Sequence, residues 1–109
     1  MPSLTPTSLR LLRSLGPHTR KHAQQLLQMH PLLQVSSALR SAAQNRRAGG
    51  VPDSFHLRGR AVDIVGPLQD LQKAADEAWR LRIGPTCTGP EEVLLEYSGD
   101  SRQHLHVAW

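Results

Sequence analysis

The apolar positions in the first thirty residues recur at the spacing of a helix. One stripe of leucines has this spacing: Leu9, Leu12 and Leu15. Thr7 and Ser8 can cap a helix that carries the stripe, and Gly16-Pro17 closes it. A second helix is expected from Pro17 to Met29, with Ala23, Leu26 and Leu27 on one face. The chain therefore starts with two short helices that can pack as a layer.

From residue 32 the spacing changes to that of strands. The segment LLQVSS reads as a short strand, 38–47 as a helical turn, and the glycines 49–50 with Pro52 as a loop. The β-branched run RAVDIV, which follows Gly59, predicts a second strand. Pro67 then opens a helix that stops at Gly84-Pro85.

The last residues, EVLLEYSGDSRQHLHVAW, contain two apolar runs around a turn at 98–101. This pattern predicts a terminal β-hairpin. Helices, then strands, one crossover helix and a hairpin together predict an α+β fold with a small, mainly antiparallel sheet and packed helices.

The length and composition fit one domain. The 109 residues are expected to form a helical part, 1–31, and a core, 32–109. The lone cysteine, Cys87, excludes an internal disulfide, so a bound metal becomes an attractive source of extra stability. The net charge of +4 favours an anionic partner, but few aromatic residues and no recognisable motif argue against nucleic acid. No apolar run approaches the roughly 20 residues that cross a membrane.

Three residues have the chemistry of a metal site: His56, Asp63 and His106. Zinc binds imidazole nitrogen and carboxylate oxygen, and catalytic zinc sites use three protein ligands. His56 and Asp63 would face opposite sides of one continuous strand, so the chain must turn between them, and Gly59 provides the freedom to do so. Taken singly, each residue is more often an ordinary surface or capping group.

The hairpin adds further polar groups beside His106. His104 shares a strand face with His106. A turn spanning 99–101 would place Glu96 opposite His104, on that same face. Glu96 then becomes a candidate general base, although an exposed charge on an edge strand is the ordinary reading of such a residue.

The stretch from Val35 to Val65 resembles the core block of zinc D-Ala-D-Ala carboxypeptidases and dipeptidases and of phage L-Ala-D-Glu endopeptidases. That block reads S-x-x-R, a glycine-containing loop, then S-x-H-x-x-G-x-A-x-D. Its counterparts in this sequence are Ser37, Arg40, Gly49-Gly50, Ser54, His56, Gly59, Ala61 and Asp63. The second motif of the superfamily, H-x-H, resembles His104-Leu105-His106.

This resemblance implies a hedgehog/DD-peptidase-like fold in which Zn²⁺ is held by His56, Asp63 and His106. It also implies that Arg40 holds the substrate near the scissile bond. Many relatives carry the catalytic acid three residues before the last zinc histidine, where this chain has Gln103. Glu96 is then the first candidate for the base.

Asp100 and His104 stay open as alternatives for the base, and His104 could instead stabilise the oxyanion.

The resemblance implies a zinc metallopeptidase that cuts the stem peptides of bacterial peptidoglycan. No export signal is visible in MPSLTPTSLRLLRSLG, so we expect synthesis in the cytoplasm and action on the wall after release or within a phage particle, as an endolysin or a virion-associated lysin. The alternative is a non-catalytic module that zinc stabilises, such as a phage particle component, and Gln103 favours it.

Overall fold

The computed structural model describes residues 5–47, 54–83, 90, 92–96 and 103–109. The elements in chain order are α1 (Pro6–Arg13), α2 (Pro17–Met29), β1 (Gln34–Ser37), α3 (Ala42–Arg47), the 3₁₀ turn η1 (Phe55–Arg58), β2 (Ala61–Val65), α4 (Leu68–Ile83), β3 (Glu92–Glu96) and β4 (His104–Ala108). The expected loop at 49–52, the hairpin turn at 98–101 and Asp100 lie outside the described residues.

The strands form one antiparallel sheet in the order β1-β2-β4-β3. The two central strands are β2 and β4, with Asp63 opposite His106. The terminal hairpin has the expected register, because Glu96 pairs with His104. This arrangement confirms the predicted α+β fold with a small antiparallel sheet.

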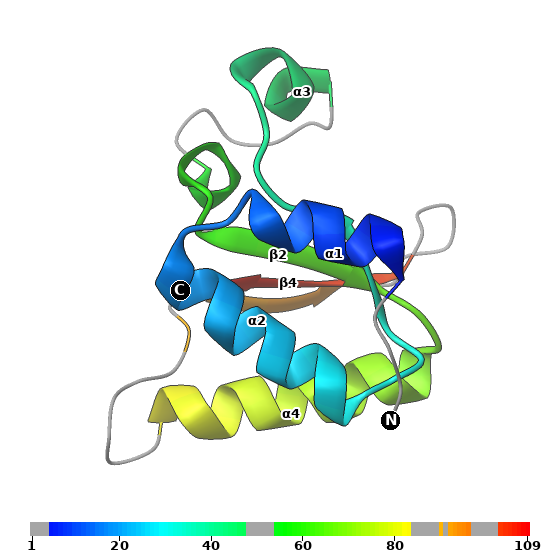
Figure 1. Ribbon diagram of the computed structural model, residues 1–109. Helices are drawn as coiled ribbons and strands as arrows, with labels where there is room; N and C mark the ends of the chain where they lie inside the picture. The colour runs from blue at the N-terminus through cyan, green and yellow to red at the C-terminus, as the bar shows by residue number, and fades with distance from the viewer. Residues whose placement is uncertain (1–4, 48–53, 84–89, 91, 97–102) are drawn as a thin grey trace.

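Helices α1, α2 and α4 share one hydrophobic core with the sheet (Figure 1). Alternate residues of the central strands, such as Val62 and Val107, are buried beneath these helices. The expected stripe of α2 is buried there too. The residues between them on each strand, including Asp63 and His106, point to the opposite face of the sheet. On that face Leu94 of β3 is 52% exposed, and we call it the open face of the sheet because α1, α2 and α4 lie on the other side.

The first helix starts earlier than the sequence predicted. Thr5 caps α1 by accepting a hydrogen bond from the backbone N–H of Ser8, and Pro6 occupies the first turn. The expected caps, Thr7 and Ser8, therefore lie inside the helix. The buried Ser8 hydroxyl instead donates to the side chain of Gln34 and accepts from the backbone N–H of Val35. These bonds fix α1 against β1.

Strand β1 contains an irregularity that the alternation of its residues did not predict. Val35 pairs with Ile64 and Ser37 pairs with Asp63, so Ser36 is an extra residue in the ladder. A bulge of this kind re-aims the side chains that follow it. Ser37 consequently lies opposite Asp63, at the edge of the open face.

Among the described residues, no helix combines the length and the apolar character needed to cross a membrane.

Candidate metal centre

Three short elements bring His56, Asp63 and His106 together. Asp63 stands in the middle of β2 and His106 is its direct partner on β4. His56 comes from η1, which Ser54 caps and which ends at Gly59 with a φ of 65°. This left-handed conformation turns the chain between His56 and Asp63, as the odd spacing of the two residues requires.

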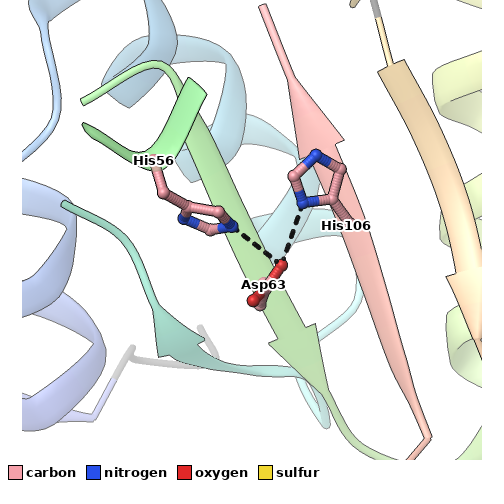
Figure 2. Close-up of side chains that lie close together, drawn as sticks. All are labelled: His56, Asp63 and His106. Carbon is pink, nitrogen blue, oxygen red and sulfur yellow. Dashed lines mark hydrogen bonds and ion pairs between the residues drawn. The ribbon is translucent and has the colours of Figure 1, made fainter. Parts of the chain in front are cut away.

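The donor atoms of the three residues converge. Nε2 of His56 lies 3.2 Å from Oδ1 of Asp63, and Nδ1 of His106 lies 3.1 Å from the same oxygen (Figure 2). One ligand atom from each residue lies within 4.8 Å of the others. His56 and Asp63 are buried, at 1% and 7% exposure, whereas His106 is partly accessible from the open face.

Each of the three side chains also makes a hydrogen bond through the atom that points away from the centre of the cluster. Nδ1 of His56 donates to the backbone oxygen of Ala38 over 2.7 Å. Oδ2 of Asp63 accepts from Arg40 over 2.8 Å, and Nε2 of His106 lies 2.9 Å from Oε1 of Glu92. Each residue thus has one atom held by the protein and one atom left for the centre of the cluster.

This donor set fits zinc. Two imidazole nitrogens and one carboxylate oxygen are the ligands of many catalytic zinc sites, which keep a fourth position open for water or substrate. The outer hydrogen bonds leave Nε2 of His56 and Nδ1 of His106 without protons when both rings are neutral, as metal binding demands.

The electrostatics of the cluster favour a cation at its centre. Burial alone would raise the pKa of Asp63, but hydrogen bonds from His106 and His56 outweigh it and hold this pKa far below its usual range. Burial alone would lower the pKa of His106, yet its hydrogen bonds to Asp63 and Glu92 raise it above the ordinary value. Asp63 therefore stays ionised, and the raised pKa of His106 favours positive charge on that imidazole.

Arg40 lies next to the metal cluster. Its Nε donates to the Ser37 hydroxyl over 3.0 Å, one terminal nitrogen donates to Asn45 over 3.3 Å, and the other donates to Asp63. Its backbone N–H also donates to the carbonyl of His56. Arg40 thus holds the candidate metal ligand Asp63 in place, a contact that the sequence did not predict.

Glu96 and His104 lie one step further along the strands. Oε2 of Glu96 is 3.7 Å from Nε2 of His104, and the Glu96 side chain is 61% exposed. Both residues face the same side of the sheet as His106. The structure therefore brings the two expected catalytic groups together beside the cluster, without direct contact to its three ligands.

Gln103 does not take part in the cluster. Its side-chain amide donates to the backbone oxygen of Gly66 over 2.9 Å, at the end of β2. Gln103, at the position where many relatives have the catalytic acid, thus tethers the start of β4 to the end of β2.

Glu92 is the residue beside the cluster that the sequence analysis missed. The expected hairpin register already contained the signal, because it places Leu94 opposite His106 and Glu92 one diagonal step away.

An α+β fold with a two-histidine, one-aspartate cluster on the open face of its sheet is a domain with a candidate zinc site. The family model of Peptidase M15 matches residues 19–107. This match covers most of the chain, so the chain belongs to the Peptidase M15 family, within the superfamily of zinc D-Ala-D-Ala carboxypeptidases and L-Ala-D-Glu endopeptidases. Comparison with curated proteins and with solved structures gives no match.

Proposed function

We propose that this chain is a zinc peptidase that hydrolyses a peptide bond in the stem peptides of bacterial peptidoglycan. The observation that carries the proposal is the convergence of His56, Asp63 and His106 on the open face of the sheet, in a chain of the Peptidase M15 family. Zinc bound there would polarise the scissile carbonyl and lower the pKa of a water molecule to about 7.

Exposed apolar side chains accompany the polar residues of the proposed site. Leu94 stands opposite His106 and is 52% exposed, and Leu39, next to Arg40 in the chain, is 47% exposed. We expect such exposed apolar side chains to contact a peptide substrate.

Arg40 suits the role of orienting that peptide. A guanidinium carries five N–H groups, and three of its donations are spent on Ser37, Asn45 and Asp63. The remaining N–H groups can donate to a carbonyl or a carboxylate of the substrate. Arg40 would then connect the substrate with the ligand Asp63.

Glu96 and His104 are the proposed proton acceptors. His104 and His106 are two residues apart on β4, which separates them by roughly 7 Å along the strand. A water between the cluster and His104 would be the proton donor, and Glu96 pairs with His104 across the hairpin. In this arrangement Glu96 takes the proton directly or through His104.

The test is digestion of purified peptidoglycan, with the products identified by mass spectrometry. We expect wild-type protein loaded with zinc to release stem-peptide fragments, and the Glu96→Gln variant to lose roughly 100- to 10,000-fold in rate while retaining its zinc. Asp76→Asn, which removes an exposed carboxylate on α4, is the matched control and should retain full activity.

Full activity of Glu96→Gln would refute its role as the base, and the test would pass to His104→Gln and Asp100→Asn. Loss of zinc together with activity would instead show that Glu96 organises the site.

A second function is favoured by Gln103. Gln103 stands where many relatives have the catalytic acid, but its amide cannot accept a proton and instead donates a hydrogen bond to Gly66. The corresponding function is a zinc-stabilised binding or structural module. It predicts zinc binding and a stability that depends on zinc, with no fragment released from any stem peptide.

A further inference from the structure

Glu92 occupies a particular place beside the metal cluster. It lies on the edge strand β3, opposite Ala108, whereas the direct partner of His106 is Leu94. The diagonal from Glu92 to His106 is within the reach of a long side chain. The carboxylate covers this distance, so that Oε1 lies 2.9 Å from Nε2 of His106 although the Glu92 side chain is 45% exposed.

The contact determines which nitrogen of His106 carries a proton. An ionised carboxylate only accepts hydrogen bonds, so Nε2 of His106 must donate to Glu92. When Nδ1 gives up the proton that it shares with Asp63 in the metal-free cluster, the neutral ring keeps its proton on Nε2 and directs the lone pair of Nδ1 to the centre of the cluster, where zinc would bind. Such a partner fixes the orientation of a metal-binding imidazole and makes it a stronger ligand.

Glu92 is poorly placed to act as a base. It contacts the nitrogen of His106 that points away from the cluster, so the imidazole ring lies between the carboxylate and the ligand atoms. Its effect must therefore pass through His106.

Glu96 differs from Glu92 in its contact with β4. The two glutamates lie on the same strand and face, but the nearest approach of Glu96 to His104 is 3.7 Å, beyond hydrogen-bonding distance. His104 is also outside the group of metal-binding atoms. Of the two glutamates, Glu92 is thus the one that contacts a candidate metal ligand.

From these contacts we infer that Glu92 is the positioning residue of the metal centre, which holds His106 in the orientation and tautomer that bind zinc. The inference rests on the proposed zinc site but not on peptidase activity. Edge strand β3 thereby becomes part of the metal centre without contributing a ligand.

The experiment measures zinc affinity by competition with a chromophoric chelator. Glu92→Ala should weaken zinc binding by roughly 10- to 100-fold. Glu92→Gln should have a smaller effect, because the amide oxygen still accepts the hydrogen bond from Nε2. Glu96→Gln removes a charge from the same strand and face, and its zinc affinity should stay within about twofold of the wild type.

The circular dichroism spectrum of each metal-free variant reports whether it folds, and Glu92→Gln carries the test if Glu92→Ala does not fold. Equal losses in Glu92→Gln and Glu96→Gln would overturn the inference, because they would indicate a general effect of charge. Wild-type affinity in Glu92→Ala would overturn it as well. If the wild type itself binds no zinc, the proposed zinc site fails, which is a distinct result.

Discussion

Arg40 has two possible roles beside the metal cluster, to support Asp63 and to contact the substrate. Its guanidinium holds the oxygen of Asp63 that faces away from the histidines, and it is itself held by Ser37 and Asn45. The Arg40 and Asp63 side chains are only 16% and 10% exposed, so their charges depend on one another in a poorly solvated place.

We predict that Arg40→Ala destabilises the metal-free protein by about 1.5–3 kcal/mol, the contribution of a hydrogen bond to a charged group. Urea denaturation measures this free energy of unfolding. Arg46→Ala, which removes an exposed arginine of α3, should change it by less than about 0.5 kcal/mol. Unchanged stability of Arg40→Ala, with only a weaker affinity for substrate, would show that Arg40 contacts substrate and does not support Asp63.

His106 makes zinc binding sensitive to pH. Its raised pKa means that, in the metal-free protein, protons compete for Nδ1 at a pH above the ordinary histidine value of 6.5. The carboxylates of Asp63 and Glu92 cause this shift, and the imidazole of His56 and the guanidinium of Arg40 also contact Asp63.

We therefore predict that zinc affinity falls as the pH is lowered from about 8 to about 5. The stability of the metal-free protein should change in the opposite sense. Protonated His106 stabilises the fold at low pH, and this contribution is lost as the pH rises through the raised pKa. Melting curves with and without zinc check both trends. A His106→Gln variant that keeps the same pH dependence would contradict this assignment.

At the scale of the elements, η1 and its glycine decide whether His56 reaches the other ligands. Gly59 has a φ of 65°, and a Cβ added there would lie 3.1 Å from the backbone oxygen of Ser14. The turn between η1 and β2 therefore combines a left-handed conformation with a close approach to the end of α1.

We predict that Gly59→Ala costs roughly 1–2 kcal/mol of stability for the left-handed conformation, and more for the close contact. Zinc affinity should fall as well, because η1 carries His56. Gly16→Ala is the matched substitution: the φ of Gly16 is −62° and the nearest atom to the new Cβ is 3.9 Å away. If both variants melt at the same temperature, the turn is less restrictive than the backbone indicates.

The elements also show how far the sequence predicts the structure. The separation of His56 from Asp63 required a turn, and the hairpin register that pairs Glu96 with His104 is confirmed. Both predictions depend only on chain geometry. The bulge in β1, which brings Ser37 opposite Asp63, depends on how β1 docks against its neighbours. No local pattern of apolar residues encodes such docking.

The candidate site was predicted to a similar extent. The motif and the alternation of strand residues pointed to His56, Asp63 and His106, and the structure brings all three together. Side-chain rotamers across strands decide two contacts, the one between Glu92 and His106 and the hydrogen bond from Arg40 to Asp63. These rotamers follow from packing that alternation alone does not specify.

For the whole molecule, the metal cluster joins segments that are distant in the sequence. η1, β2 and β4 each contribute one candidate ligand. A ligand that binds only the folded chain stabilises it by mass action, about 2.7 kcal/mol when free zinc is 100 times its dissociation constant.

We predict that removing zinc with a chelator lowers the melting temperature by roughly 10–20 °C, since each kcal/mol shifts a domain of this size by about 4–8 °C. Differential scanning calorimetry measures the shift, and metal analysis should give one zinc per chain. His56→Ala should melt at one temperature with and without zinc. An equal shift in this variant would mean that zinc stabilises the fold from a different site.

The pairing of the central strands has a consequence for the order of events in folding. Asp63 and His106 are 43 residues apart, so their strands meet only after a long loop has closed. We expect the encounter of β2 with β4 to limit the folding rate, because it closes this long loop, so that zinc meets its complete set of ligands late. An ion that binds after the barrier slows unfolding and leaves the folding rate nearly unchanged. The metal centre would then set the lifetime of the folded chain, while the encounter of β2 with β4 sets how quickly it forms.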